Sequence, residues 1–334
     1  MRQQNILPEM ILAKVLEDEV KSWVEEGYPG VTQTTYTLLK YWFDRDESAK
    51  ERFYLCQQRA IETIIYCHEI LGINSLKEAY ERLCPEVLAV KKSVREEVGK
   101  ILFPKYCLKM ATGSGKTWVL EALVIWQYFN YINGEKPFRY SNNFVIVTPG
   151  KEVLDRMLDA FKGKRDPKTG LRDPRMRDLE LSLFMPQSQE WKGRFNLLEK
   201  VLEPGDIKPN MPLPDEGFIY ITNWQQFRLR KDKESVYDRT IKDVEEPLRG
   251  EIILNFLENY DNLVIMNDEA HHVHGQKNED QEYLVWRDFI DNRLYKRLDE
   301  KYKDKKFFLQ IDFSATPFYG SKENRQYFAH IVYD

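Results

Sequence analysis

Two acids and three of the chain's five histidines crowd into the stretch NDEAHHVHG, residues 267–275. Asp268 and Glu269 are adjacent carboxylates, so one can hold a divalent cation while the other orients a water molecule. The histidines, together with the acids, could instead form a transition-metal site. The choice between these two chemistries decides what the protein does.

The spacing of the histidines favours magnesium over zinc. His271, His272 and His274 lie one, two and three positions apart, so at most His271 and His274 share a helical face. No cysteine pair or second histidine cluster stands near them in the sequence. We therefore expect a magnesium site, a structural or coupling role for His271 and no special role for the other two. A metal-dependent hydrolase built on the histidines remains the less favoured alternative.

A second stretch, MATGSGKT, predicts a binding site for the nucleotide whose magnesium ion the acids would hold. Gly113 and Gly115 let backbone N–H groups turn toward a phosphate chain, and the helix expected to begin behind them adds its partial positive charge. Lys116 would reach the β and γ phosphates, and the Thr117 hydroxyl would bind magnesium. We expect ATP to contact Thr112, Gly113, Ser114, Gly115, Lys116 and Thr117.

The two acids and this phosphate loop are the two parts that an ATP-hydrolysing site requires. A phosphate-loop enzyme needs a carboxylate at a neighbouring strand end to hold magnesium and a second group to orient the attacking water. Asp268 and Glu269 follow the apolar run NLVIM and fit these two roles. Lys116, Asp268 and Glu269 are thus the predicted catalytic residues, with Thr117 and Asp268 as magnesium ligands. One departure is that Met110 stands where the usual loop pattern has its first glycine.

Five apolar runs predict the element that positions both sites. Each is continuous rather than alternating, which is typical of strands buried on both faces of a parallel sheet between helices. We therefore expect an α/β fold with ligands at the carboxyl ends of the strands. About seventy residues separate the second run from the third, which predicts an insertion at about residues 162–216. The runs are KYCLKM, NNFVIVT, GFIYIT, NLVIM and FFLQIDFSAT.

The first hundred residues have a helical pattern instead. Apolar residues recur at helical spacing, and proline and glycine stand where helices begin and end. We expect helices from Pro8 to a cap at Gly27, from about Thr34 to Trp42 and from Cys56 to Gly72, with a break at Pro85.

Composition limits the classes of partner. The net charge of −4 does not suit general binding to nucleic acid, so any such contact must be local. The basic stretch FKGKRDPKTGLRDPRMR, residues 161–177, is either a solvated loop or a phosphate-contacting one. No run is long enough to span a membrane, and acids interrupt what would be a signal peptide. We expect a cytoplasmic protein with reduced cysteines.

Six motifs in order resemble a known family. ATGSGKT is similar to motif I, DEAHH to motif II and FSATP to motif III of the superfamily-two DEAD/DEAH-box helicases and translocases. Within that superfamily the chain resembles the restriction subunit of type III restriction enzymes. YLCQQRAIETIIY is similar to the adenine-reading Q motif, and VTPGKEVLDRM and ITNWQQF are similar to motifs Ia and Ib. The resemblance runs from about Phe53 to the last residue.

This resemblance implies roles for further residues. Gln57 would recognise the adenine base, and His271 would sit between the γ phosphate and a partner domain. Ser314 and Thr316 would couple the nucleotide state to the nucleic-acid face. The implied layout is a RecA-like parallel sheet in residues 101–334, preceded by a helical region, residues 1–100, that contains the Q-motif helix. The residues implied on the nucleic-acid side are Pro149, Lys151, Thr222 and Asn223.

The family also implies parts that this sequence does not contain. We expect this sequence to lack the second RecA-like domain with its motif VI arginine and the nuclease carboxylate cluster, since neither pattern is recognisable in it. Because such an arginine contributes on the order of a thousandfold to the rate, we expect ATP binding to exceed hydrolysis. The implied partners are double-stranded DNA, the second RecA-like domain and a modification (methyltransferase) subunit, with no membrane. The alternative is a regulatory or scaffold module that binds nucleotide without hydrolysing it.

Overall fold

The structure, a computed structural model, describes most of the 334-residue chain. All elements given below lie within the described residues, and no helix among them has the length and apolar character needed to cross a membrane. The described ranges are 8–44, 53–136, 138–176, 181–227, 249–270, 288–316, 318–319, 326–327 and 331–334.

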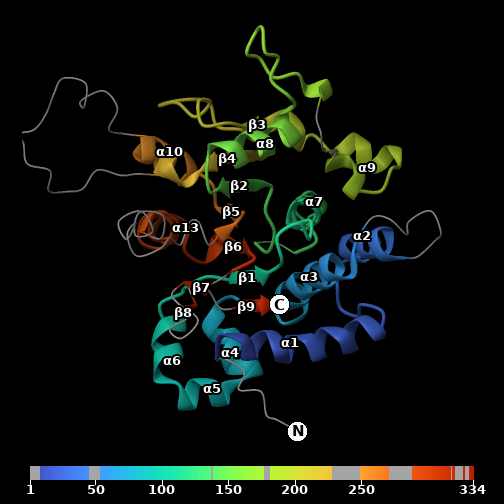
Figure 1. Ribbon diagram of the computed structural model, residues 1–334, viewed down its shortest axis with the longest axis vertical. Helices are drawn as coiled ribbons and strands as arrows, with labels where there is room; N and C mark the ends of the chain where they lie inside the picture. Colours follow the sequence, from blue (N-terminus) through green and yellow to red (C-terminus); the bar gives the residue numbers. More distant parts are fainter. Residues whose placement is uncertain are drawn as a thin grey trace, which may run out of the picture.

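A seven-stranded, all-parallel sheet forms the centre of the molecule (Figure 1). Its strand order is β3-β4-β2-β5-β6-β1-β9. The five apolar runs are β1, β2, β4, β5 and β6, so the predicted α/β fold is confirmed. The strands are β1 (Lys105–Lys109), β2 (Asn143–Thr148), β3 (Val201–Leu202), β4 (Phe218–Asn223), β5 (Asn262–Asn267), β6 (Phe307–Ser314) and β9 (Ile331–Tyr333). A separate antiparallel pair joins β7 (Phe318–Tyr319) to β8 (Gln326–Tyr327).

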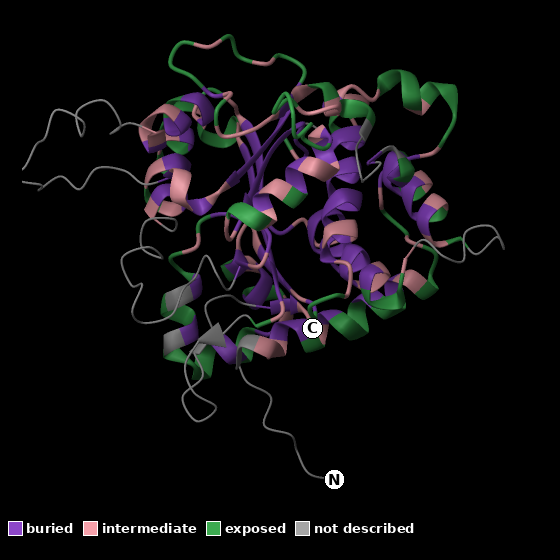
Figure 2. Ribbon diagram, turned by 45° about the horizontal axis from the view of Figure 1, so that its top comes forward, coloured by how far each residue is buried: buried purple, intermediate pink, exposed green. Residues whose placement is uncertain are grey.

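Both faces of the sheet are covered, which explains the continuous apolar runs (Figure 2). Phe144 and Ile146 of β2 point into one hydrophobic cluster, whereas Val145 and Val147 point into the other. A strand in such a place needs an apolar residue at every position. The first cluster includes side chains of α7 (Lys116–Asn133) and α8 (Lys151–Lys162), and the second includes those of α10 (Arg249–Leu257), η8 (Asp288–Leu294) and α13 (Tyr295–Tyr302).

The amino-terminal helices share the first cluster with α7. Gly27 has a φ of 84° just after the first helix, as expected of a glycine cap, and Pro85 opens a new helix. The Trp126 indole donates to Glu69 at 2.8 Å, which ties α7 to this region. The helices are α1 (Pro8–Glu25), α2 (Gln33–Phe43), α3 (Leu55–Ile65), η2 (Tyr66–Ile70), α4 (Leu76–Leu83), α5 (Pro85–Val90) and α6 (Lys92–Val98).

Part of the predicted insertion returns to the core. Phe184 and Leu197 are buried in the first cluster, and β3 extends the sheet beside β4. The Trp42 indole donates to the Phe184 carbonyl at 2.8 Å, so the insertion also contacts the amino-terminal helices. The remaining helices are η3 (Pro174–Met176), η4 (Leu181–Phe184), α9 (Gln189–Arg194), η5 (Leu197–Lys200), η6 (Trp224–Phe227) and η9 (Lys303–Lys305).

Candidate functional site

The carboxyl ends of five neighbouring strands form one edge of the sheet, and the predicted site residues follow these ends. The strands lie in the order β4, β2, β5, β6, β1, and all are parallel. Residues predicted for nucleic acid follow β4 and β2, whereas residues predicted for the nucleotide follow β5 and β1. β6, which ends at Ser314, lies between β5 and β1. The sheet order therefore separates the two predicted functions in space.

The phosphate loop, residues 110–117, joins β1 to the first turn of α7. Gly113 and Gly115 have φ angles of 80° and 77°, in the left-handed region that favours glycine. A Cβ atom on Gly115 would also lie 2.1 Å from Nε2 of Gln57. Glycine is therefore needed at position 115 for both backbone conformation and space. The turn directs the amino end of an 18-residue helix toward the mouth of the loop.

Met110 shows why the first glycine of the usual pattern is dispensable here. Its φ is not in the positive region, and its side chain is 3% exposed and packs into the first hydrophobic cluster. Its amide donates to the Ser314 carbonyl at 3.0 Å. An apolar residue at this position therefore anchors the start of the loop to the core and to the end of β6.

Lys116 and Glu269 meet at the mouth of the loop. The Lys116 Nζ lies 2.5 Å from Oε1 of Glu269, and the two side chains are 7% and 21% exposed. Glu269 has a φ of 49°, which costs a residue with a Cβ atom on the order of 1 kcal/mol. The chain thus turns sharply at the end of β5 and brings a carboxylate to the lysine of a loop on the other side of β6.

Asp268 is a buried carboxyl group with a raised pKa. It is 8% exposed, and its amide donates to the Val147 carbonyl at 2.9 Å. Burial, followed by the negative charge of Glu269, raises the pKa of Asp268 to about 6, although Lys116 opposes the rise. A magnesium ion would supply positive charge, and the half-buried Thr117 in the first turn of α7 offers a hydroxyl oxygen as a second ligand. The donor set of Asp268 and Thr117 therefore fits the expected ion.

Gln57 lies against the phosphate loop. It is 3% exposed; its Oε1 accepts from the Tyr54 amide at 2.8 Å, and its Nε2 donates to the Ser114 carbonyl at 2.9 Å. The structure thus brings the Q-motif glutamine to the loop, where its amide group holds backbone atoms. The neighbouring side chains of Tyr54 and Leu55 are 74% and 62% exposed.

The residues implied on the nucleic-acid side lie just after β2, at the start of α8 and at the end of β4, and hydrogen bonds join these segments. The Thr148 hydroxyl donates to the Thr222 carbonyl at 3.1 Å, and the Trp224 indole donates to the Pro149 carbonyl at 3.0 Å. Thr222 itself is fully buried, whereas Lys151 at the start of α8 is exposed. Lys151 therefore offers an exposed positive charge at the start of α8, beside the exposed acid Glu152.

Ser314 is the last residue of β6, and Thr316 lies two residues further along the chain. Ser314 is fully buried, and its Oγ accepts from the Thr316 amide at 3.1 Å. Thr316 is exposed. His271, for which we predicted a coupling role, lies outside the described residues, as do His272 and His274. Within the described residues, no group of three or more histidine, cysteine or acidic side chains is arranged to hold a metal ion.

A buried polar network beneath this edge was not predicted. Asp312 is fully buried within β6, and its Oδ1 accepts from Asn267 Nδ2 at 2.5 Å and from Gln310 Nε2 at 2.9 Å. The network joins the last residue of β5 to β6, two residues before Ser314. The signal was present in the sequence, because a buried strand rarely carries polar residues at alternate positions unless they are paired.

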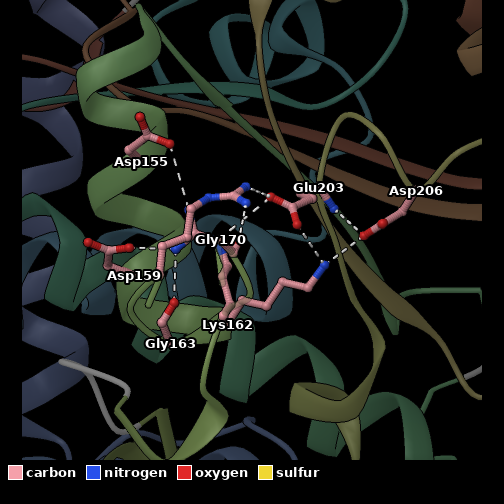
Figure 3. A network of polar contacts seen from close by, with 9 residues as sticks. Asp155, Asp159, Lys162, Gly163, Gly170, Glu203 and Asp206 are labelled. Carbon is pink, nitrogen blue, oxygen red and sulfur yellow. Dashed lines mark hydrogen bonds and ion pairs between the residues drawn. The ribbon is translucent and has the colours of Figure 1, made fainter. Parts of the chain in front are cut away.

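The basic stretch after α8 forms a second charged cluster, which we call the Arg172 clamp (Figure 3). Arg172 is 4% exposed and contacts Asp159 at 2.5 Å and Glu203 at 3.7 Å. Lys162 contacts Glu203 at 3.3 Å and Asp206 at 2.7 Å, and Arg165 also contacts Glu203. These basic side chains face carboxylates of the same chain. The structure therefore favours a structural role for them over contact with phosphate.

A phosphate loop and an acidic strand end, set two strands apart on a parallel sheet, are the arrangement expected of a phosphate-loop ATP-binding domain. In agreement with this class, comparison with known protein families matches residues 52–319 to the type III restriction enzyme res subunit. The chain belongs to this family, whose matched part is a superfamily-two helicase-like motor domain. The comparisons with curated proteins and with solved structures give no match.

Proposed function

We propose that this protein binds Mg-ATP at the phosphate loop and couples its hydrolysis to movement along double-stranded DNA. The observation that carries the proposal is the 2.5 Å contact of Lys116 with Glu269 at the amino end of α7. The contact joins a buried cation to an acid at a helix terminus, and with the neighbouring Asp268 these groups would stabilise a triphosphate and its magnesium ion.

Each residue has a distinct part in the proposed reaction. The ammonium group of Lys116 moves from Glu269 to the β and γ phosphates when ATP binds. Glu269, released from the lysine, orients the attacking water and accepts its proton. Asp268 and Thr117 would hold magnesium, which would supply positive charge to the phosphates.

The order of the strands supports coupling to nucleic acid. The 3.0 Å hydrogen bond between Met110 and Ser314 joins the phosphate loop to β6, and Asn267 joins β5 to the same strand. A change in the nucleotide would reach the loops after β2 and β4 through these contacts. We propose DNA binding there, with residues 1–100 as a helical region and 101–334 as the first RecA-like domain, which a second RecA-like domain and a modification subunit would complete.

The proposal is tested by measuring ATP binding and ATP turnover, with and without duplex DNA. Glu269→Gln keeps the shape of the side chain but removes its charge, so it should abolish turnover while ATP still binds. Glu258→Gln, which changes an acid directly after α10 that pairs with Arg297 at 2.7 Å, is the matched control and should bind and turn over ATP as wild type does. Absence of ATP binding by the wild-type chain would overturn the proposal. Binding without DNA-stimulated turnover would limit it to nucleotide binding.

A further inference from the structure

A cavity of about 320 Å³ lies at the amino edge of the sheet, where β2 begins at Asn143 and β5 begins at Asn262. Because the strands are parallel, this edge is opposite the one that holds the phosphate loop. The end of α7, the insertion, the segment between α10 and β5 and the end of α13 supply the other walls. The volume is that of a small-molecule site, and the cavity shares no residue with the proposed ATP site.

The charged side chains that line the cavity are both acids, Asp215 and Asp261. Among the described residues, neither acid forms an ion pair with a basic side chain. Lys301 lies near this edge, but it donates to the Glu258 carbonyl at 3.1 Å and to Asn259 Oδ1 at 3.2 Å. It therefore caps the end of α10 and leaves the two acids of the cavity without a positive partner.

Three tyrosines line the cavity, each at or near the carboxyl end of a helix. Tyr131 lies in the last turn of α7, Tyr302 is the last residue of α13, and Tyr260 lies three residues after α10. Burial, followed by the charge of Asp261, raises the pKa of Tyr131, and burial followed by the charge of Asp215 raises that of Tyr260. Each acid thus lies near a ring. Since the carboxyl end of a helix carries partial negative charge, the helix ends add to the negative potential.

Asn143 brings a buried acceptor to this cavity. It is 3% exposed, and its Nδ2 lies 3.1 Å from Asn142 Oδ1, 3.2 Å from the Asn262 carbonyl and 2.9 Å from Asn262 Oδ1. Because all three neighbours are acceptors, the amide nitrogen must face them. Its Oδ1 has no hydrogen-bond partner within the described part of the chain. A buried acceptor without a donor costs free energy, so a ligand that brings an N–H group would be stabilised here.

We propose that this cavity binds the primary ammonium group of a small organic cation, such as an alkyl diamine. The acids and the helix ends attract the charge, the three tyrosine rings can cover the cation and its alkyl chain, and Asn143 Oδ1 can accept an N–H. An anion does not suit these walls, and a quaternary ammonium ion has no N–H for Asn143. The inference does not rest on the proposed function, because the two sites lie at opposite edges of the sheet.

Calorimetric titration of the full chain tests the proposal, with putrescine (1,4-diaminobutane) as the probe. The matched ligand is 1,4-butanediol, which has the same length but no charge. Near neutral pH, putrescine should bind saturably, one molecule per chain, and at least about tenfold more tightly than the diol, because hydrogen bonds from a charged donor are stronger. The absence of saturable putrescine binding, or equal affinity for both ligands, would overturn the inference.

A pair of charge variants tests the place of binding. Asp215→Asn removes an exposed acid of the cavity and should weaken putrescine binding at least about fivefold. Asp304→Asn makes the same charge change on an exposed acid that lies before β6, at the same edge but outside the cavity. This control should keep the wild-type affinity. Equal weakening by the two variants would mean that putrescine responds only to net charge, which would overturn the inference.

A pair of tyrosine variants tests the aromatic wall. Tyr131→Leu removes a ring that is 40% exposed and should weaken putrescine binding about threefold, the size of an exposed cation–π contact. Tyr36→Leu, at a tyrosine of α2 that is 39% exposed, is the matched control and should keep the wild-type affinity. The circular dichroism spectra of both variants should match that of wild type. Unchanged affinity in a folded Tyr131→Leu chain would contradict the proposal.

Discussion

The mouth of the phosphate loop and the Arg172 clamp both bring basic side chains against carboxylates. They differ in how many basic partners are available to each carboxylate. In the clamp, Lys162, Arg165 and Arg172 each contact at least one carboxylate, and the acid Asp155 is half-exposed to water. At the loop, two adjacent acids lie beside Lys116, and burial raises the pKa of one of them, Asp268. A high density of charged residues in the sequence therefore does not mark a ligand site, whereas a buried acid with a perturbed pKa at a strand end does.

The strongest test of this comparison is Lys116→Ala. Loss of a charge-assisted contact to phosphate is worth up to about 3 kcal/mol, so ATP affinity should fall about 100-fold. Equilibrium titration with ATP measures the effect, and the circular dichroism spectrum should stay that of wild type. If this variant left ATP affinity unchanged, the phosphate loop would be no more a ligand site than the Arg172 clamp.

Arg172→Ala should have the opposite profile. It leaves Asp159 and Glu203 without their most buried partner, and because both acids are partly exposed we expect a loss of about 2 kcal/mol in the free energy of unfolding. Chemical denaturation measures this loss. ATP affinity should stay at its wild-type value, and a large drop in ATP affinity would mean that the clamp belongs to the nucleotide site.

The raised pKa of Asp268 predicts a pH dependence at the loop. Magnesium needs the ionised carboxylate, so with a pKa of about 6 the magnesium-dependent part of ATP binding should fall about tenfold from pH 7 to pH 5. Because the folded pKa lies above the ordinary value near 4, the ionised form costs folding free energy, and this cost is absent below about pH 4 and grows as the pH rises through 6. Titrations at several pH values check the first effect, and Asp268→Asn should abolish it.

The smallest effect on stability and binding is expected for Arg175, near the end of the basic stretch. Arg175 is 89% exposed and pairs only locally, with Asp173 two residues away. Exposed pairs of this kind contribute little, so Arg175→Ala should leave the melting temperature unchanged. It should also leave the salt dependence of DNA binding unchanged if the stretch does not contact phosphate. If the variant made DNA binding less dependent on salt concentration, Arg175 would be a DNA contact.

The sequence predicted the central strands because their burial on two faces leaves a strong local signal. NNFVIVT and NLVIM became β2 and β5 at nearly the expected residues. The two-residue β3 and the three-residue β9 were not predicted, because so short a strand carries no pattern and forms only beside an existing edge. The loop that holds Lys116 and the acids after β5 were recognised from spacing, since their chemistry demands particular residue types.

What could not be predicted depends on contacts between segments far apart in the chain. Nothing near Arg172 in the sequence shows that Glu203 will neutralise it, because their approach depends on the path of the insertion. A groove lined by α1, the start of α3 and β9 likewise combines segments from opposite ends of the sequence. The positive φ of Glu269 was also not predicted, because glutamate is not a residue type that indicates a left-handed backbone conformation.

The position of β1 in the sheet has a consequence for how the protein is made. Its two neighbours are β6 and β9, so the strand before the phosphate loop pairs only with segments that begin about two hundred residues later. On the ribosome, β1 waits with both backbone edges open until those segments emerge. Pairing at such long range slows folding and leaves an apolar strand exposed to aggregation, so this chain should depend on chaperones during synthesis.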